Sequence, residues 1–388
     1  MTPLTQLIEQ YCPDGVDYVK LGDVATYYRG LTYSKKNEVE SGGLKVLRAN
    51  NVSLNTQRID WNDVKNVELD KPVKPTCLLK QDDILMVANS GSKAHVGKIA
   101  YINQDFVDVA FGGFMATIRA KDTRSSRYIY HVLSSDEFKA YKDSVLSSAT
   151  INNLKKSIVE EFQIPLPPRE VQDAIVERLD AFATLVESLD SEIVLLEKRF
   201  EYFREQLLTF DDSAGVEYVN LGDVATVKAG SSVSKQKIAE SAGIYPVINS
   251  GREPLGFIAE FNSTDPIGIT TRGAGVGFVS WTEGPHFKGN LNYSVKVNSH
   301  IVSDRFLFFT LKEHGESIRD LCSFAGIPAL NLKSIKTLVF PLPPREVQDA
   351  IVDKLDTLQA LIDNLKHERD LRRTQFAYYR EKLLTFNS

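Results

Sequence analysis

The segment PLPPREVQDAIV, from Pro165 to Val176, occurs twice in this chain of 388 residues. The same twelve residues return from Pro341 to Val352, and the tetrapeptide LLTF follows each copy, at Leu207–Phe210 and at Leu383–Phe386. Both motifs repeat at one offset of 176 positions, so no insertion separates them in either copy. The fold is therefore expected to be organised around two long segments of equal length.

The first of these segments is predicted to be one continuous helix from 168 to 209. Pro167 and Pro168 suit an extended approach and a first helical turn, and no further proline or glycine occurs before Gly215. At ~1.5 Å per residue the helix would be about 63 Å long, which is more than one globular domain can bury. Its apolar residues alternate at steps of four and three, as in the a/d seam of a coiled coil. They are Ile175, Leu179, Phe182, Val186, Leu189, Ile193, Leu196, Phe200, Phe203 and Leu207.

The second copy is the expected partner of the first. Arg369 and Arg372 interrupt its seam, which predicts a polar or locally shifted stretch at that point. Each well-buried Leu, Ile or Phe contributes roughly 1.5 to 3 kcal/mol, so even a partial seam would hold the two helices together. Two separate amphipathic helices, each lying on its own domain, are the alternative. The matching apolar positions are Ile351, Leu355, Leu358, Ile362, Leu365, Phe376, Tyr379 and Leu383.

A second repeat precedes each helix. VDYVKLGDVAT at Val16–Thr26 is matched by VEYVNLGDVAT at Val216–Thr226, an offset of 200, and LGDVAT is expected to form a strand in both copies. The chain is thus an internal duplication with an approximate twofold axis, and its two long helices would pair as an antiparallel coiled coil. The expected domains are a globular domain over 1–164, a long helix over 165–212, a second globular domain over 213–340 and a second long helix over 341–388.

Each globular domain is predicted to be a mixed α/β (α+β) domain, because short β-type runs alternate with loops that contain Gly and Asn. The expected strands are 44–48, 84–88, 98–102 and 114–119 in the first domain, and 245–249, 267–271, 278–281 and 293–297 in the second. Helices are expected over 126–138, with Ser125 or Ser126 as the cap, and over 304–312. Both domains end in a small-residue loop before Asn-Leu-Lys, namely Ser148, Ala149 and Thr150 before Asn153–Lys155, and Ala325, Gly326 and Ile327 before Asn331–Lys333.

The charge and hydropathy of the chain limit which partners it can bind. The net charge is −5, and the acidic excess lies in residues 165–210, which hold 5 basic and 10 acidic side chains. Residues 1–164 hold 21 and 20, so any affinity for DNA must come from local patches. The chain contains neither a signal-like leader nor an apolar stretch of about 18 residues, so it is expected to be cytoplasmic and not to contact a membrane.

Catalytic and metal-binding patterns are missing from the sequence. Ser90–Lys98 fails as a phosphate loop, because five residues separate Gly91 from Gly97 and Ile99 follows the lysine. The sequence contains no Asn-Pro-Pro-aromatic or Asp-Pro-Pro-aromatic motif of an amino-methyltransferase. Its three cysteines and six histidines show no disulfide or metal spacing. We expect no catalytic site, no metal site and no cofactor in this chain.

The paired PLPPREVQDAIV helices, the paired LGDVAT segments and two unlike intervening domains resemble the DNA-specificity subunit of type I restriction-modification systems. The resemblance covers the whole chain. It implies two target-recognition domains, each reading one half of a bipartite site on double-stranded DNA, with the coiled coil setting the gap. It also implies two docked methyltransferase subunits that use S-adenosylmethionine, and leaves open two restriction subunits that would use ATP and Mg²⁺. The subunit itself would be non-catalytic.

Candidate DNA contacts are polar residues of the divergent loops, since Arg or Lys can pair with guanine and Asn with adenine. The strongest is Arg272, and Arg272→Ala is expected to affect one half-site only. Lys155 and Lys333 are expected to touch phosphate. For each residue, a solvated loop side chain is the alternative. The others are Arg29, Tyr33, Lys35, Arg48, Asn50, Asn51, Ser90, Ser92, Lys93 and His95 in the first domain, and Ser234, Lys235, Asn249, Ser250, Arg252, Thr271, Asn290 and Asn292 in the second.

Two further interpretations stay open at the level of the sequence. A non-catalytic coiled-coil scaffold, whose two heads bind peptides or glycans, would show no salt-dependent binding to DNA. A DNA-reading subunit could also serve a fused nuclease-methylase instead of separate subunits, and neighbouring genes would distinguish the two.

Overall fold

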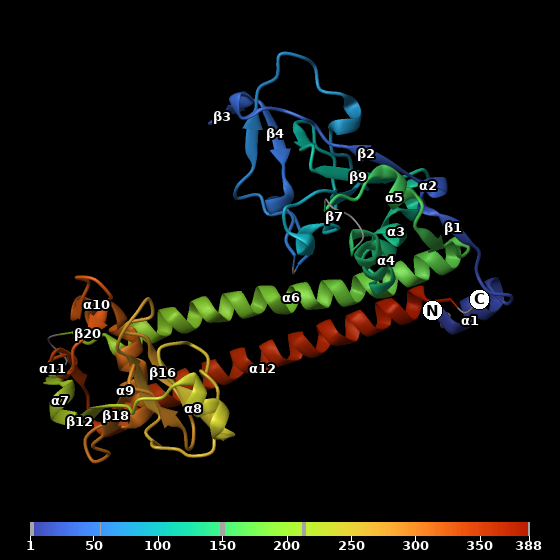
Figure 1. Ribbon diagram of the computed structural model, residues 1–388. Coiled ribbons are helices and arrows are strands. Elements are labelled where there is room, and N and C mark those ends of the chain that lie inside the picture. Colours follow the sequence, from blue (N-terminus) through green and yellow to red (C-terminus); the bar gives the residue numbers. More distant parts are fainter. Residues whose placement is uncertain (1–3, 55, 148–151, 212–214, 387–388) are drawn as a thin grey trace. The chain divides into compact units, whose positions relative to one another are not determined.

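The computed structural model describes residues 4–54, 56–147, 152–211 and 215–386. The chain forms two compact units. The first spans Met1–Ser188 and Arg369–Ser388, and the second spans Leu189–Glu368. Each long helix therefore contributes one part to each unit (Figure 1).

The elements of the first unit run in the following order. Its helices are α1 (Leu4–Tyr11), α2 (Leu21–Val24), α3 (Ser126–Leu133), α4 (Asp136–Ser147), α5 (Lys156–Glu160), the first part of α6 (Arg169–Leu208) and the last part of α12 (Arg345–Leu384). Its 3-10 turns are η1 (Lys35–Asn37), η2 (Ala49–Asn51), η3 (Pro75–Cys77), η4 (Lys93–His95) and η5 (Thr123–Ser125). Its strands are β1 (Tyr18–Lys20), β2 (Ala25–Arg29), β3 (Glu38–Val39), β4 (Leu44–Leu47), β5 (Lys65–Val67), β6 (Ile84–Val87), β7 (Ile99–Tyr101), β8 (Val109–Phe111), β9 (Met115–Ala120) and β10 (Gln163–Pro165).

The second unit repeats this plan with fewer elements. Its helices are α7 (Leu221–Val224), α8 (Lys235–Glu240), α9 (Asp304–Glu313), α10 (Gly315–Asp320) and α11 (Leu332–Lys336), with the remaining parts of α6 and α12. Its strands are β11 (Glu217–Asn220), β12 (Ala225–Ala229), β13 (Ala242–Ile248), β14 (Phe257–Ile258), β15 (Ile267–Thr270), β16 (Val279–Trp281), β17 (Phe287–Lys288), β18 (Asn292–Val297), β19 (Cys322–Ser323), β20 (Ala329–Leu330) and β21 (Val339–Leu342).

The sheets of the two units have the same topology. The main sheet has the antiparallel order β2-β9-β6-β7 in the first unit and β12-β18-β15-β16 in the second. A smaller sheet, β3-β5-β4-β8 or β14-β13-β17, includes one parallel pair, β4 with β8 and β13 with β17. The duplication predicted from the sequence therefore extends into the divergent regions, and mixed α/β domains with long helices are confirmed.

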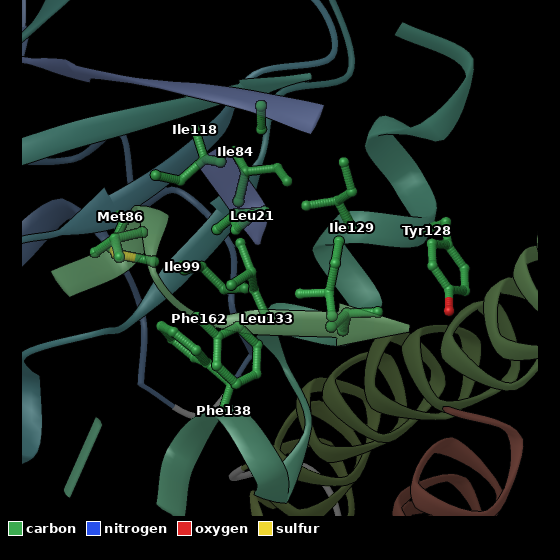
Figure 2. Packing of buried hydrophobic residues seen from close by; sticks show 14 of the residues in the cluster. Leu21, Ile84, Met86, Ile99, Ile118, Tyr128, Ile129, Leu133, Phe138 and Phe162 are labelled. Atoms are coloured by element: carbon green, nitrogen blue, oxygen red, sulfur yellow. The ribbon is translucent and has the colours of Figure 1, made fainter. Parts of the chain in front are cut away.

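The core of the first unit lies between its main sheet and helices α3 and α4. Ile84 and Met86 of β6 and Ile118 of β9 pack with Leu133 of α3 and Phe138 of α4, and all five are buried (Figure 2). Each such side chain contributes about 1.5 to 3 kcal/mol when it leaves water. This core fixes the ends of the strands, from which the loops extend.

The second unit has an equivalent core. Ile267 of β15 and Val295 of β18 pack with Phe306 and Phe309 of α9, and all four are buried. Leu355 of α12 belongs to the same cluster. The globular part of the second unit is therefore built directly on the helical segments that belong to it.

The repeated Pro-Pro and Gln of the motif define where each long helix begins. The Gln172 side chain donates through Nε2 to the Pro167 carbonyl (2.8 Å), and Gln348 does the same to Pro343 (2.9 Å). The amide of Gln172 also bonds the Pro168 carbonyl (3.1 Å), which forms the first turn. α6 begins one residue after the predicted start and ends one residue before the predicted end.

The two long helices pack against each other within each unit. In the first unit, Phe182 of α6 lies against Phe376 and Tyr379 of α12, with ring centroids 6.4 and 5.3 Å apart. In the second unit, Glu197 of α6 pairs with Lys366 of α12 at 2.6 Å. The N-terminal part of α6 thus meets the C-terminal part of α12, which is the antiparallel pairing predicted from the shared seam.

The interrupted part of the second helix is polar. Arg369 pairs with Asp370 (2.8 Å), and Arg372 donates to Gln375 of its own helix (3.1 Å). The Arg369 side chain is only 20% exposed, so a charged group replaces an apolar residue of the seam at a partly buried place. This agrees with the polar stretch predicted there.

The expected LGDVAT strand is wrong in its first four residues. Leu21–Val24 and Leu221–Val224 form single helical turns, α2 and α7, and only the following Ala-Thr enters a strand. Leu221 and Val224 are both buried, because a spacing of three places them on one face of a helical turn. Gly22 allows close packing, since a Cβ there would lie 2.9 Å from that of Glu160.

The single helix expected over 126–138 is also wrong, because α3 ends at Leu133 and α4 begins at Asp136. The Ser135 hydroxyl donates to the Val132 carbonyl (2.7 Å) and accepts the Phe138 amide (3.3 Å), so it ends one helix and caps the next. The expected small-residue loop at Ser148, Ala149 and Thr150 lies outside the described residues, as does the expected domain boundary after residue 212. The four-part division of domains stays a prediction.

Candidate nucleic-acid interface

A close approach of two glycines shapes the loop end of each unit. An added Cβ at Gly30 would lie 2.2 Å from the Gly112 carbonyl oxygen, and one at Gly230 would lie 2.2 Å from that of Gly289. No other residue type fits such a contact. The two glycine pairs therefore hold the start of one loop against the turn that precedes β9 or β18.

In the first unit, two predicted residues lie at this contact. The Arg29 Nε donates to the Gly113 carbonyl (3.2 Å), and the amide of Gly112 donates to Leu47 (2.8 Å). Arg48 follows Leu47, and its Cγ would lie 3.9 Å from a Cβ at Gly112. The structure thus brings Arg29 and Arg48 to the same turn, although they are 19 positions apart in the sequence.

Arg48, Asn50 and Asn51 belong to one hydrogen-bonded loop. Arg48 and Asn50 both donate to the Asp63 carboxylate, each at 2.9 Å. The buried Asn51 amide donates to the carbonyls of Asp60 (2.9 Å) and Asp63 (3.0 Å). Asn51 therefore holds the loop in shape, while Asp63 neutralises the arginine that this loop carries.

Four predicted residues lie in the loop after β6. Ser92, Lys93 and His95 are exposed, and η4 spans Lys93–His95. The Ser90 hydroxyl accepts the amide of Ser92 (3.3 Å), which turns the chain. This loop presents a cation and several hydrogen-bonding groups to solvent.

Tyr33 and Lys35 lie at the start of the smaller sheet. Tyr33 packs against the cluster of Val46, and burial raises the pKa of its hydroxyl, an effect that Glu38 reinforces and Arg48 opposes. Its ring is therefore partly structural. Lys35 is exposed in η1.

In the second unit, four predicted residues form a compact network. The amide of Thr271 donates to Leu291 (2.9 Å), and the amide of Leu291 donates to the Asn249 Oδ1 (3.0 Å). Asn292 is buried and donates to the Asn249 carbonyl (3.1 Å). Thr271, Asn249 and Asn292 thus order the backbone, and Arg272 extends from it as an exposed side chain.

The remaining residues of the second unit lie on its surface or at helix ends. The Ser234 hydroxyl accepts the amide of Lys237 (3.1 Å) and caps α8, which begins at Lys235. Arg252 lies over the Phe278 ring at 5.4 Å. Ser250 is partly buried and Asn290 is exposed.

Lys155 and Lys333 are both exposed, yet they are not equivalent. Lys155 is the N-cap residue of α5, whereas the N-cap residue of α11 is Asn331. The two Asn-Leu-Lys triplets therefore do not occupy equivalent positions, because the helix follows the third residue of the first triplet and the first residue of the second. This corrects the prediction that the two domains end alike. The offset of 176 that relates the long helices also relates Lys155 to Asn331.

A buried lysine that no sequence pattern indicated, Lys288, lies beside the glycine contact. The Lys288 Nζ donates to the Asp265 carbonyl (2.9 Å) and to the Ile267 carbonyl. Burial lowers the pKa of Lys288 to about 8, and Asp265 opposes the shift. The Lys288 carbonyl accepts a hydrogen bond from the amide of Ser231 (2.9 Å). In the first unit the Phe111 carbonyl accepts the equivalent bond from Leu31 (2.7 Å), so Lys288 and Phe111 occupy matching positions. No pattern in the sequence distinguishes this lysine from a surface residue.

A hollow of about 820 Å³ in the second unit was also missed. Arg252 and Gly275 line it on the loop side, and Arg204, Lys312 and Arg319 contribute positive charge. Arg204 is paired with a glutamate, but the described residues give Arg252, Lys312 and Arg319 no such ion pair. Glu313 and Glu316 also line the hollow, so its lining carries four Lys or Arg side chains and two Glu side chains and is positive on balance.

Matching ion pairs attach both globular parts to helical segments of their own unit. Arg127 of α3 pairs with Asp180 of α6 (2.8 Å), and Arg305 of α9 pairs with Asp356 of α12 (2.6 Å). His131 adds a bond to Asp180 (2.8 Å). Burial lowers the pKa of His131 despite this bond, while the hydrogen bonds from His131 and Arg127 overcome the effect of burial and lower the pKa of Asp180.

Within the part of the chain that the structure describes, no group of three or more His, Cys, Asp or Glu side chains is placed to hold a metal ion. None of the helices searched there is long and apolar enough to cross a membrane.

Comparison with known proteins identifies the family. The sequence matches the family model described as "Type I restriction modification DNA specificity domain" at residues 13–198 and again at 214–371. The StySPI specificity subunit of Salmonella potsdam is 26% identical over 396 residues, which cover 92% of this chain and 84% of that protein. The EcoKI specificity subunit of Escherichia coli strain K12 is 30% identical over 199 residues, covering 50% of this chain and 42% of that protein.

The fold is also known from solved structures. The S subunit of the type I restriction-modification system of M. genitalium aligns with a TM-score of 0.64 at 18% identity, over 96% of this chain and 97% of that chain. The relatives are named as specificity subunits, which confirms the prediction of a non-catalytic subunit. Because the family model covers both halves of the sequence, the chain belongs to the DNA-specificity subunits of type I restriction-modification systems.

Proposed function

We propose that this chain reads a bipartite, asymmetric site on double-stranded DNA, with one half-site recognised by each unit. The observation that carries the proposal is the repeated glycine contact beneath loops whose side chains differ, Gly30 with Gly112 and Gly230 with Gly289. A repeated backbone supports the same task in both units, and different side chains support different sequences. Residues 1–164 and 213–340 are then the two target-recognition domains.

Exposed cations of the loops would provide the contacts to DNA. Arg29, Lys93 and Arg272 are exposed at loop ends, where guanine or phosphate can be reached. The positive hollow beside Arg252 would add contacts to phosphate in the second half-site. Because the net charge is −5, these local patches must supply the affinity.

The long helices over 165–212 and 341–388 would set the spacer between the half-sites. α6 and α12 each contain 40 residues, which corresponds to about 60 Å at ~1.5 Å per residue. A helix of constant length fixes a distance without contacting bases. The spacer would therefore be constant among the sites that this subunit recognises.

Apolar residues on the outside of the helices support docking of two methyltransferase subunits. Val194, Leu195 and Tyr202 of α6 are 51%, 58% and 58% exposed. Large apolar side chains that gather on one exposed helix often mark a protein interface. The partners would bind S-adenosylmethionine and methylate adenine at N6, and two restriction subunits using ATP and Mg²⁺ would complete a nuclease. Such a complex would act in the cytoplasm.

Mapping N6-methyladenine across the genome of cells with and without this gene tests the proposal. We expect a split motif of two short, different half-sites to disappear on deletion and to return on complementation. A continuous motif would contradict the two-unit reading. If every methylation motif remains after deletion, and the purified complex shows no salt-dependent binding to DNA, a scaffold that binds other ligands would be favoured.

A further inference from the structure

We infer that Asn89 of the first unit and Arg272 of the second occupy the same position and determine base preference there. The inference rests on the proposed function and deepens it. It adds a residue that the sequence pattern did not single out, and it pairs the two units position by position where their sequences do not align.

The backbone around Asn89 defines the position in the first unit. The amide of Ala88 donates to Phe114 (2.9 Å), and the amide of Leu154 donates back to Ala88 (2.8 Å). Asn89 itself forms an antiparallel bridge with Asn153. The strand end at Asn89 is thus held between the turn that joins β8 to β9 and the segment that leads to α5.

The same bonds recur around Arg272. The amide of Thr271 donates to Leu291 (2.9 Å), and the amide of Leu330 donates back to Thr271 (2.8 Å). Arg272 forms an antiparallel bridge with Ala329. Thr271 therefore corresponds to Ala88, Leu330 to Leu154 and Arg272 to Asn89.

A side-chain bond confirms this correspondence through different residues. The Tyr27 hydroxyl donates to the Leu154 carbonyl (3.2 Å), and the Tyr293 hydroxyl donates to the Leu330 carbonyl (2.9 Å). Tyr27 lies on β2, whereas Tyr293 lies on β18, the counterpart of β9. The acceptor is conserved although the donor has moved to the neighbouring strand.

The loops that start at these residues also end at the same place. Gly97 and Gly277 have φ values of 79° and 83°, and each amide donates to the last carbonyl of the preceding strand, β6 or β15, at 2.8 Å. Residues 89–96 and 272–276 connect the equivalent ends, so the first loop is longer by three residues. The two loops differ in length and sequence on one fixed base.

The side chains at the shared position face away from the core. Ala88 and Thr271 are buried, and successive residues of extended chain point to opposite sides, so Asn89 and Arg272 point outward. Neither side chain has a hydrogen-bond partner among the described residues; Arg272 is exposed, and Asn89 is partly exposed. Both are free to bond a ligand, unlike Asn51 and Asn292.

The chemistry of the two side chains then predicts the bases. An asparagine amide can bond the N6 and N7 edge of adenine, and an arginine guanidinium can bond O6 and N7 of guanine. The first half-site should contain an adenine, and the second half-site a guanine, each at the base pair that lies against this position.

The test is the methylation map of cells whose gene carries Asn89→Ala or Arg272→Ala. We expect Asn89→Ala to reduce methylation about 5- to 150-fold through the first half-site, relaxing one base pair there, and Arg272→Ala to do the same in the second. Asn103→Ala, an exposed asparagine outside the loop, is the matched control and should leave the map unchanged.

The exchange variants Asn89→Arg and Arg272→Asn make the test independent of loss of fold. Each should move the preference of its own half-site, from adenine to guanine or the reverse. The inference would be overturned if the split motif depends on the gene but both half-sites keep their base preferences in all four variants. The proposed function would then still stand. A wild-type gene on which no split motif depends would overturn both.

Discussion

Removing the carboxylate of Asp356 should loosen the globular part of the second unit from its helix. Arg305 of α9 bonds Asp356 through Nε and Nη2, both at 2.6 Å, and its guanidinium also lies over Trp281 at 4.7 Å. The Arg305 side chain is 25% exposed and that of Asp356 is 39% exposed. Asp356→Ala would leave a half-buried guanidinium without its partner.

The magnitude follows from this intermediate exposure. Fully exposed ion pairs contribute about 0.2 to 1 kcal/mol, and removing one partner of a buried pair costs about 3 to 5 kcal/mol. Because water reaches Asp356, we expect a cost near the middle, about 2 kcal/mol. That value corresponds to a roughly 30-fold change in an equilibrium constant.

Native-state hydrogen exchange of the full chain, followed by mass spectrometry, would localise the effect. Amides of Asp304–Glu313 should lose protection about 30-fold in Asp356→Ala. Glu260→Ala is the matched control, because it breaks the exposed Lys237–Glu260 pair, whose side chains are 46% and 57% exposed. If the loss of amide protection in Asp356→Ala is as small as that in Glu260→Ala, the exposed fraction of an ion pair does not determine its contribution here.

Three further predictions concern the helix start, the pH dependence and the phosphate contacts. Gln348→Ala should cost about 3 kcal/mol in urea denaturation and Gln172→Ala about 1 kcal/mol, because the Gln348 side chain makes three hydrogen bonds to backbone groups and the Gln172 side chain makes one. Equal costs for the two variants would refute this. Burial lowers the pKa of His131, so the unfolded imidazole takes up a proton first and the wild-type chain should lose stability as the pH falls below about 6.5. The melting temperature of His131→Phe should fall less over the same pH range. Parallel pH profiles of the two melting temperatures would contradict this. Lys155→Ala and Lys333→Ala should each lower the salt dependence of DNA binding by the assembled complex by about one counterion, and an unchanged slope would exclude a phosphate contact.

The long helices could be predicted from the sequence because their signals are local and repeated. Pro168 marks the start, the steps of four and three mark the buried face, and both ends of α6 lie within one residue of the prediction. Strands such as Ile84–Val87 were also predicted, since a short apolar run between turns indicates burial directly. The break at Ser135 was missed because its hydroxyl acts as a cap only once the chain has turned there.

The equivalence of Asn89 and Arg272 could not be predicted from the sequence. Backbone hydrogen bonds define that position, and any residue except proline can make them, so neighbouring side chains need not resemble each other. Asp180 and Asp356 were hidden for another reason: each lies in the repeated helix, but its arginine partner lies about 50 positions away in a region that has diverged. Pairs of this kind become visible only when the fold brings them together.

The two tyrosines that bond equivalent carbonyls have a consequence for how such chains evolve. The first unit has Tyr27 on β2 and Ala116 on β9, and the second has Val227 and Tyr293 at the matching positions of β12 and β18, so a tyrosine hydroxyl reaches the equivalent carbonyl from either of two strands. Losing the ring would leave a void and an unpaired acceptor, and adding a second ring would overfill the core. The two positions are therefore coupled, and a lineage can cross between the two arrangements only through a less stable intermediate. A sequence alignment would show two variable columns, although the hydrogen bond from a tyrosine hydroxyl to the equivalent carbonyl is present in both units.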